Sequence, residues 1–465
     1  MAMNAAGDSR QGRGPQTKTG SARPANAPPV SLTLWKLIPP GPCLVAGLMS
    51  GTSHDGISAA LVRIEERDGR PRYALRAFKV SPYRRALRER MLSAAEGRPA
   101  RPLWPKRSAD GQANGGAAAE LSTLNFALGR ALAEAALKLL EHAGVAPHEL
   151  ALIGSHGHTF FHLPPRAAHR GQTPSTLQLG EPAVIAALTG VPVVADFRPM
   201  DMALGGQGAP LAPLAHLLLF GDPGRGRVVQ NIGGIANATY LPPNARVGDP
   251  RLIAFDTGPG NMPIDALAAR LSAGRLRMDK DGRLAARGKV SEPLLARLMK
   301  HRYFDRQPPK STGREEFGLS FVRQLTAWGK KLRLSELDLI ATATALTARS
   351  IGEAVRRFVA PLGPVEQLIV AGGGAHNRTL MRMLKAQLPE IEVLNADQLA
   401  VDGDAVEAMA FAILAYEMIR GRPGNIPSVT GARCPAILGK LTLPPSLPPR
   451  PANGRARQAG AGISA

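Results

Sequence analysis

The chain has 465 residues, which is long enough for two or three domains with a sizeable core. Its formal charge of +22 suggests an anionic partner, but aromatic residues make up only 4% of it, and base-stacking platforms need aromatic side chains, so we expect no nucleic-acid partner. No apolar run is long enough to cross a membrane, and two cysteines, Cys43 and Cys434, argue against a disulfide framework and suit a reducing cytoplasm.

The first 40 residues are polar and rich in Gly, Pro and Ala, and we expect them to form a disordered leader without a secretory signal. From Cys43 an apolar run enters a Gly/Ser/Thr turn. Alternating apolar residues at 57–64 and 73–79 then predict two more strands, and a helix is expected at 84–96.

The stretch 99–118 has no hydrophobic period and is predicted to be a surface insertion, whereas 119–143 is an amphipathic helix. Strands and helices alternate after that, and 274–335 is expected to be irregular and helical. The expected strands are 150–154, 191–195, 228–231, 236–241, 252–256, 367–370 and 391–394. The expected helices are 182–189, 210–220, 261–273, 338–360, 377–387 and 404–420.

This order contains two similar halves. A strand–turn–strand unit opens the chain, another at 228–241 opens its second half, and each is followed by alternating helices and strands. Duplicated α/β halves around a nucleotide cleft are typical of the actin-like, hexokinase-type ATPase fold, and fit this order better than one Rossmann sheet. The expected division is an N-terminal domain at 41–225, a C-terminal domain at 226–441 and a Pro-rich tail at 442–465.

The turn at 47–56 is the first candidate site. Small residues let backbone N–H groups approach an anion, hydroxyls add donors, and an Asp can hold a magnesium-bound water or a sugar hydroxyl. An ordinary polar hairpin is the alternative, although the turn is unusually polar for one. The nucleotide-binding candidates here are Gly51, Thr52, Ser53, Asp55 and Gly56.

Two further glycine turns follow predicted strands. One, at 231–237, occupies the matching point of the second half, and the other, at 371–377, precedes a helix whose N-terminus favours an anion. Either turn would be weak evidence alone. The nucleotide-binding candidates are Asn231, Gly233, Gly234, Gly372, Gly373, Gly374 and Asn377.

An acid and a basic loop complete the site. Asp256 ends an apolar strand before a Gly-Pro-Gly turn, where an α/β cleft binds ligands; helix capping is the alternative. In the loop 195–210, Arg198 is placed to form a bidentate contact with a substrate carboxylate, and a structural ion pair with Asp196 or Asp201 is the alternative. Asp196 and Asp201 are themselves substrate-binding candidates, and Gly206 and Gln207 follow as further ones.

Two more stretches are ambiguous. His156, His158 and His162 invite a metal-site interpretation, but no cysteine or acid in this stretch completes one, so we predict no metal ligand set here and favour a polar loop that borders the substrate, with His156 as a contact. The turn at 310–314 has the basic and hydroxyl groups to contact phosphate or sugar, and a solvated loop is the alternative.

Together these stretches resemble the anhydro-N-acetylmuramic acid kinase family. Nine motifs occur in order over about residues 44–440, which makes the resemblance specific, while the leader, the insertion and the tail fall outside it. The motifs are GLMSGTSHDG (47–56), GSHGHT (154–159), ADFRPMDMALGGQGAPL (195–211), NIGGIAN (231–237), FDTGPGN (255–261), KSTGREEF (310–317), GGGAHN (372–377), VEAMAFAILA (406–415) and PGNIPSVTGA (423–432).

The resemblance implies a two-domain actin-like fold with ATP and Mg²⁺ in the cleft. It also suggests a homodimer, and we expect the enzyme in the cytoplasm. It implies hydrolytic opening of 1,6-anhydro-N-acetylmuramic acid with phosphorylation of O6, giving N-acetylmuramic acid 6-phosphate and ADP in cell-wall recycling. Asp256 matches the family's acid and is expected to be the general base, Glu407 a second catalytic acid, and Arg198 the partner of the lactyl carboxylate.

The sequence departs from the family pattern at His54, His158 and Pro263, which puts the substrate preference in doubt but not the acid or the glycine turns. Two alternatives remain: a non-catalytic actin-like scaffold that binds nucleotide, and a phosphatase of the same fold. Release of ADP with and without the anhydro sugar distinguishes them.

Overall fold

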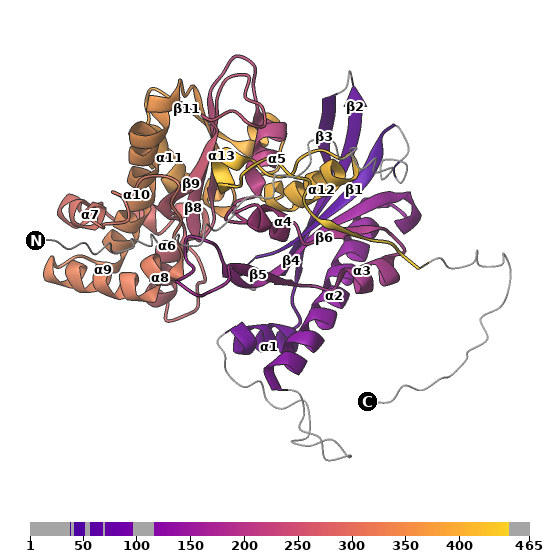
Figure 1. The fold of residues 1–465 in the computed structure, drawn as a ribbon. Coiled ribbons are helices and arrows are strands. Elements are labelled where there is room, and N and C mark those ends of the chain that lie inside the picture. Colours follow the sequence, from indigo (N-terminus) through magenta and orange to yellow (C-terminus); the bar gives the residue numbers. More distant parts are fainter. Residues whose placement is uncertain (1–37, 39–40, 52–55, 68–69, 96–115, 446–465) are drawn as a thin grey trace, which may run out of the picture. The chain divides into compact units, whose positions relative to one another are not determined.

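The computed structural model describes residues 38, 41–51, 56–67, 70–95 and 116–445, all of which belong to one compact unit (Figure 1). Most of the predicted leader, insertion and tail lies outside these residues, as do Thr52, Ser53 and Asp55 of the first glycine turn. The predicted division into two domains near residue 225 stays a prediction.

The first sheet is built mainly from the first half of the chain. Its central strand β1 pairs antiparallel with β2, which pairs with β3, and on its other side β1 pairs parallel with β4, which continues to β6. The edge strand β12 is added from the end of the chain, and β5 pairs only with β4. The strands are β1 (Cys43–Ser50), β2 (Gly56–Arg67), β3 (Arg70–Pro82), β4 (Leu150–Leu163), β5 (Ser175–Leu179), β6 (Val193–Ala195) and β12 (Lys440–Thr442).

The second sheet repeats this order. Its central strand β7 pairs antiparallel with β8, which pairs with β9, while on the other side β7 pairs parallel with β10 and β10 with β11. The repeated order confirms the predicted duplicated α/β architecture of the actin-like class. The strands are β7 (Arg227–Ile232), β8 (Ile235–Leu241), β9 (Ile253–Pro259), β10 (Gln367–Ala371) and β11 (Glu392–Asn395).

The predicted helices are found within a few residues of their expected bounds, the stretch 274–335 contains α7, α8 and α9 as the expected irregular and helical region, and α4 and α13 are added. None of the described helices is long and apolar enough to span a bilayer. The helices are α1 (Arg85–Ala95), α2 (Gly116–Ala143), α3 (Pro182–Thr189), α4 (Arg198–Ala203), α5 (Ala212–Phe220), α6 (Met262–Leu271), α7 (Glu292–Met299), α8 (Arg314–Phe317), α9 (Leu319–Lys331), α10 (Glu336–Ala354), α11 (Arg378–Gln387), α12 (Val406–Ile419) and α13 (Pro427–Thr430).

One predicted loop is a strand. The sequence predicts a polar loop at 155–162, but β4 runs on to Leu163, because β1 pairs with it as far as His158 and β5 returns alongside the remainder as an antiparallel partner. Residues 155–158 are buried in this strand. Pairing with a distant segment satisfies the backbone, so the polar side chains do not prevent a strand.

Helix α12 joins the two halves of the core. Every residue of α12 except Glu407 is buried, which explains why the helix is apolar on all sides. It lies directly on the backbones of β1 and β4, because a Cβ at Gly47 would overlap the carbonyl oxygen of Ala408 and a Cβ at Gly154 that of Phe411. These two glycines therefore determine how deeply α12 sits, and with it the place of Glu407.

Gly154→Ala is expected to lower the free energy of unfolding by about 3 kcal/mol, because a methyl group there must displace the backbone of α12. Denaturant unfolding followed by circular dichroism measures the change. Gly224→Ala is the matched control, since the nearest atom to its added Cβ would be 3.8 Å away. Equal stability of the two variants would contradict close packing of α12 on β4.

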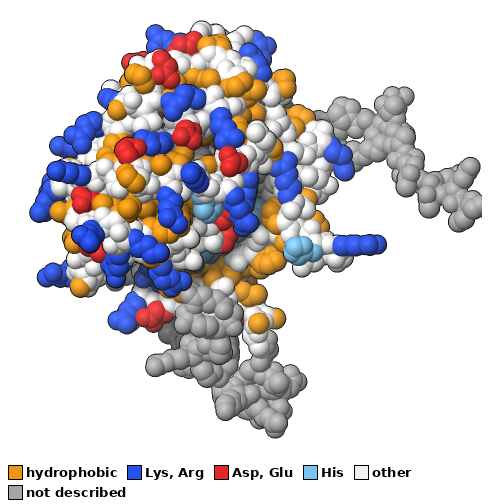
Figure 2. Space-filling view, turned by 90° about the vertical axis from the view of Figure 1, so that its left-hand side faces the viewer, with side chains coloured by type: hydrophobic (Ala, Val, Ile, Leu, Met, Phe, Trp, Pro, Cys, Tyr) orange, Lys and Arg blue, Asp and Glu red, His pale blue; other side chains and the backbone are white. Residues whose placement is uncertain are grey.

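Positive charge is spread over the described surface. Figure 2 views the molecule from the side on which α7 and α9 lie in Figure 1, and Lys and Arg side chains extend across this face with acidic and apolar ones between them. The excess of positive charge on this face is therefore dispersed and does not form one basic stripe.

Candidate active site

A cavity of about 550 Å³ brings together residues from both halves of the chain. It is bordered by the end of β4 and the loop after it, by α4 and α5, by β7 to β9, by the 309–311 segment and by the start of α12. Its polar lining combines cations, carboxylates and amides, as a site for an anionic sugar and a phosphate donor requires. These lining residues are Arg166, Arg198, Gln207, Asn231, Asn237, Asp256 and Glu407, whereas Lys310 also lines the cavity but directs its ammonium group at the carbonyl oxygens of Tyr303 and Phe304.

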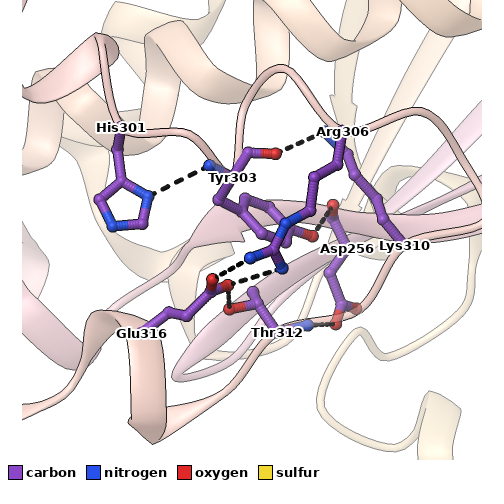
Figure 3. A network of polar contacts seen from close by, with 7 residues as sticks. All are labelled: Asp256, His301, Tyr303, Arg306, Lys310, Thr312 and Glu316. Atoms are coloured by element: carbon purple, nitrogen blue, oxygen red, sulfur yellow. Dashed lines mark hydrogen bonds and ion pairs between the residues drawn. The ribbon is translucent and has the colours of Figure 1, made fainter. Parts of the chain in front are cut away.

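Asp256 is held in the cavity wall from three directions. Its Oδ2 accepts a hydrogen bond from the backbone N–H of Thr312 at 2.8 Å, and its carbonyl oxygen accepts one from the hydroxyl of Tyr303 at 2.6 Å (Figure 3). Its own N–H donates to the carbonyl oxygen of Lys310 at 3.0 Å. Burial raises the pKa of Asp256 to about 6, although the N–H of Thr312 opposes the shift. A carboxyl group with such a pKa suits a general base near neutral pH.

The capping alternative for Asp256 is wrong. β9 continues beyond Asp256 to Pro259, and Asn261 occupies the N-cap position of α6. The carboxylate accepts from Thr312 instead, and Lys310, which is buried with 9% of its surface exposed, and Ser311 line the cavity, so the start of the turn at 310–314 is part of the site wall, while Arg314 is exposed.

Glu407 is the second acid on the cavity. It lies in the first turn of α12, and its Oε1 accepts a hydrogen bond from the side-chain amide of Asn231 at 3.2 Å. Its carboxylate is reached from the cavity, yet protein surrounds it on the other sides, and this burial raises its pKa while Asn231 and the charge of Arg198 oppose the shift. The structure thus places both predicted catalytic acids on one cavity.

Arg198 lies at the start of α4 and is oriented by neutral partners. Its Nε and Nη2 donate to Nε2 of His156 at 3.1 and 2.8 Å, and its Nη1 donates to the carbonyl oxygen of Gly208 at 2.7 Å. Burial and the charge of Arg198 both lower the pKa of His156, so the imidazole is neutral and accepts through Nε2. His156 therefore orients Arg198 from behind and does not line the cavity.

The alternative considered for Arg198, a structural ion pair with Asp196 or Asp201, does not form, because both carboxylates have other partners. Asp201 is fully buried: its Oδ2 accepts from the N–H of Gly208 at 2.8 Å and its Oδ1 from the side chains of Asn425 and Thr430, each at 2.7 Å. Asp196 forms an ion pair with Lys440 at 2.8 Å. Neither lines the cavity, which corrects their assignment as substrate contacts.

Two neighbours of Asp201 have different roles. Gly206 packs on Asp201, where a Cβ would overlap its carboxylate, so its small size serves packing and not the substrate. Gln207 lines the cavity as predicted, and its Oε1 accepts from the N–H of Arg166 at 3.2 Å.

The glycine turns of the second half form one backbone cradle. The N–H of Asn261 donates to the carbonyl oxygen of Gly233 at 2.8 Å, and that of Gly260 to Gly234 at 2.9 Å. A Cβ at Gly372 would overlap Oδ1 of Asn231, which brings the third turn to the same place. Cβ atoms at Gly233 and Gly373 would meet nothing closer than 3.7 Å, so open space for an anion remains beside them.

Three other predicted nucleotide residues are placed differently. Asn377 is buried and caps α11, since its side-chain oxygen accepts from the N–H of Leu380 at 2.9 Å. A Cβ at Gly374 would overlap Ile232, and one at Gly56 would lie 2.6 Å from the carbonyl oxygen of Ser81. These three residues therefore have local structural roles, and the assignment of Asn377 as a nucleotide contact is corrected to that of a helix cap. Gly51 is the last described residue of the first glycine turn.

The three histidines of β4 form no metal site within the described chain. His156 accepts from Arg198, His158 Nδ1 lies 2.8 Å from the hydroxyl oxygen of Ser50, and His162 Nδ1 lies 3.0 Å from that of Thr176. Each imidazole ring therefore contacts a different helix or strand: α4, β1 and β5 respectively. His158, one of the departures from the family pattern, thus reaches the end of β1 beside the first glycine turn.

Sequence reasoning missed Arg166. It lies in the loop after β4, lines the cavity and donates from Nη1 to the carbonyl oxygen of Pro309 at 3.1 Å, so it connects the first half of the chain to the segment beside Asp256. The only sequence signal for Arg166 is a positive charge in a Pro-containing loop. Arg170 lies in the same loop with the same charge, so the sequence does not distinguish the two.

A duplicated α/β fold with glycine turns and two acids on one cavity is the architecture of an enzyme that transfers phosphate to a sugar-sized acceptor. The chain belongs to the anhydro-N-acetylmuramic acid kinase family, whose model matches residues 43–444. It is 44% identical over 401 residues to the anhydro-N-acetylmuramic acid kinase of Caldanaerobacter subterraneus subsp. tengcongensis, covering 86% of this chain and 97% of that one. It is 40% identical over 403 residues to the enzyme of that name from a strain of Bacillus cereus, covering 86% and 99%.

Solved structures with a similar arrangement are distant. A ROK family glucokinase from Streptomyces griseus, in complex with glucose and AMPPNP, is 13% identical with a TM-score of 0.34 and covers 80% of this chain and 99% of that one. An activator of 2-hydroxyisocaproyl-CoA dehydratase from Clostridium difficile, with bound ADPNP, is 11% identical with a TM-score of 0.40, covering 81% and 96%. The fold assignment rests on the repeated strand order and not on these likenesses.

Proposed function

We propose that this protein is an ATP-dependent kinase that opens the 1,6-anhydro bond of 1,6-anhydro-N-acetylmuramic acid with water and phosphorylates O6, giving N-acetylmuramic acid 6-phosphate and ADP for cell-wall recycling. Family membership supports the substrate. The observation that carries the chemistry is Asp256, a carboxylate with a raised pKa that lies on the same cavity as Glu407 and Asn231 of the glycine hairpin.

Asp256 acts as the general base in this proposal. Its Oδ2 is engaged by Thr312, and no hydrogen bond to Oδ1 is found among the described residues, so Oδ1 takes the proton of the attacking water. The water oxygen forms the new bond to C1, the C1–O6 bond breaks, and O6 accepts the γ-phosphoryl group with release of ADP. Glu407 carries negative charge near the sugar and stabilises the positive charge that develops at C1.

The cradle formed by the glycine turns fits the phosphates of ATP. Open space lies on the Cβ side of Gly233 and Gly373, so that an anionic oxygen can approach the backbone of these turns closely. Mg²⁺ neutralises phosphate charge when bound, and usually uses only one or two carboxylates together with phosphate oxygens. The two cavity acids, and Asp55 by sequence, provide donors of this type. Of the predicted nucleotide residues we retain Gly51, Thr52, Ser53, Asp55, Asn231, Gly233, Gly234, Gly372 and Gly373 in this proposal.

Two cations are available for the lactyl carboxylate of the sugar. Arg198 faces the cavity with its guanidinium held by His156 and Gly208, and Arg166 borders the same space beside Gln207. We assign the carboxylate to Arg198, because a guanidinium that is already oriented loses little conformational freedom on binding.

A coupled product analysis tests the function. Purified protein is incubated with ATP, Mg²⁺ and the anhydro sugar in ¹⁸O-labelled water, and ADP and sugar products are followed by mass spectrometry. The expected result is ADP release that depends on the sugar, with one ¹⁸O at C1 and phosphate on O6. ADP release that is independent of the sugar would support a phosphatase, and nucleotide binding without turnover would support a scaffold.

The pH profile gives a second check. Because the base must be ionised, log(kcat/KM) is expected to fall with a slope of about one below pH of about 6, the pKa to which burial raises Asp256. The sign is that of a raised carboxyl pKa: activity is present above it and lost as the pH falls through it. A profile that stays flat to pH of about 4.5, near the ordinary range of carboxyl groups, would contradict this role of Asp256.

Two properties follow from the proposed reaction and the family. We place the enzyme in the cytoplasm, because the reaction consumes ATP. We also propose a homodimer, which the family resemblance suggests. Multi-angle light scattering at micromolar concentration checks the oligomer, and a mass of one 49.0 kDa chain would contradict it.

A further inference from the structure

We propose that the segment from Tyr303 to Glu316, here named the 303–316 segment, is a positioning device that orients Asp256 towards the substrate water, and that Thr312 and Glu316 act in the reaction through Asp256. The inference rests on the proposed function, because it assigns residues that support its general base. It starts from the observation that this one segment makes three hydrogen bonds to Asp256, two to its backbone and one to its carboxylate.

The contacts restrain both the backbone and the carboxylate of Asp256. The hydroxyl of Tyr303 binds the carbonyl oxygen of Asp256 and the N–H of Thr312 binds Oδ2 (Figure 3). The carbonyl oxygen of Lys310 accepts from the N–H of Asp256 on the other side of the residue. With Oδ2 restrained, the carboxylate plane has one orientation and presents one oxygen to the water. A general base that is misplaced by about 1 Å can lose about 10²-fold in rate, so this restraint bears directly on turnover.

The N–H of Thr312 is itself held in place by an ion pair. The Thr312 hydroxyl donates to Oε2 of Glu316 at 2.7 Å, and both carboxylate oxygens of Glu316 accept from the guanidinium of Arg306, at 2.5 and 3.3 Å. The same guanidinium lies 5.3 Å from the ring centroid of Tyr303. Arg306, Glu316 and Thr312 therefore close the segment on itself next to the carboxylate, as Figure 3 shows.

The buried ammonium group of Lys310 links the middle of the 303–316 segment to its beginning. Its Nζ donates to the carbonyl oxygens of Tyr303 and Phe304, both at 3.4 Å, and lies 4.6 and 4.8 Å from the ring centroids of Phe358 and Tyr303. This ammonium group points into the protein and away from the carboxylate. It ties residue 310 to residues 303 and 304, so that the Lys310 carbonyl oxygen and the Tyr303 hydroxyl reach Asp256 together.

A purely structural role is the alternative. Tyr303, Phe304 and Phe317 belong to a buried aromatic cluster, so the segment also contributes to the core. The two roles differ in one observable. A hydrogen bond from Thr312 favours the ionised carboxylate, so weakening it raises the pKa of Asp256, whereas lost packing lowers stability and leaves the pH profile of the folded enzyme unchanged.

Thr312→Val is the test variant, because it is nearly isosteric and removes only the hydroxyl that binds Glu316. We expect kcat to fall about tenfold and KM for the sugar to stay within about twofold, because a charge-assisted hydrogen bond that is loosened costs about this factor. The acid limb of kcat/KM should move to higher pH by about half a unit. Thr312→Ser, which keeps the hydroxyl, should retain most of the activity, and the acid limb of its kcat/KM profile should stay at the wild-type pH.

Glu316→Gln should shift the profile in the same direction, because the ion pair with Arg306 is lost. Glu292→Gln is the matched control: it removes another two-point ion pair of the same half, with Arg349 at 3.0 and 3.2 Å, at a place outside the 303–316 segment. If Glu316→Gln does not fold, Tyr303→Phe replaces it, since it removes only the hydroxyl bond to the Asp256 carbonyl oxygen.

The proposal is overturned if folded Thr312→Val has the wild-type rate and pH profile, if its rate falls while the acid limb stays in place, or if Thr312→Ser loses as much activity as Thr312→Val. These outcomes are distinct from failure of the proposed function. In that case the wild-type enzyme itself would release no ADP in response to the anhydro sugar.

Discussion

Asp256→Asn is expected to lower kcat about 10³-fold, because Asn cannot accept the proton of the attacking water and a positioned general base contributes about 10²–10⁴-fold. Opening of the anhydro bond and phosphorylation of O6 should fall together, since O6 is freed only when C1 is attacked. Affinity for ATP should stay within several-fold, because the glycine turns hold the phosphates. Analysis of both products at fixed times measures kcat, and nucleotide titration measures the affinity for ATP.

The variant should also fold well. Burial raises the pKa of Asp256 in the folded state to about 6, so the ionised carboxylate costs stability above that pH, and this cost decreases as the pH falls from about 6 towards the ordinary carboxyl pKa of 3.8, below which it is absent. Replacing it with neutral Asn should therefore leave the melting temperature at pH of about 8 equal or higher. Asp281→Asn is the control, an ion-paired aspartate whose positive φ of 59° Asn tolerates. Loss of ATP binding with retained turnover at saturating ATP would assign Asp256 to Mg²⁺ instead.

Glu407→Gln is expected to lower kcat about 10²-fold, because it removes the negative charge that stabilises positive charge at C1 in the transition state. The amide oxygen of Gln can still accept from Asn231, so the hydrogen bond and the start of α12 should survive. The fall should appear in kcat at saturating sugar and ATP. Steady-state kinetics with both substrates varied measures it.

The matched control for this variant is Glu336→Gln, which removes a carboxylate from the first turn of another helix, α10, where it pairs with Arg270 at 2.8 Å outside the cavity. The control should keep the wild-type rate. A normal kcat with a raised KM for the sugar in Glu407→Gln would show that Glu407 only binds a sugar hydroxyl, and would leave Asp256 as the one acid of the reaction.

The sequence by itself determined the repeated order of strands and helices and the places of the two acids. Hydrophobic periodicity and glycine turns are local signals, so the strand before Asp256 and the apolar helix that begins beside Glu407 could be predicted from neighbouring residues alone. A uniformly apolar pattern such as that of α12 is typical of a buried helix. It did not indicate that Gly47 and Gly154, far away in the chain, make room for that helix.

Only the tertiary structure decided which polar residues line the cavity. Asp201 and Asn377 have the same chemistry as site residues, yet one holds Gly208, Asn425 and Thr430 together and the other caps α11. Local patterns cannot separate these roles, because a side chain that accepts backbone N–H groups and one that binds a substrate need the same donors and acceptors.

Contacts between distant segments were equally out of reach of the sequence. Thr312 and Asp256 are 56 residues apart, and Arg166 and Pro309 are 143 apart. β4 extends through a polar stretch because β1 pairs with its first part and β5 with the rest. Each of these depends on how separate elements pack, and packing energy depends on the partner surface, so sequence periodicity positions the elements but not the side chains that meet between them.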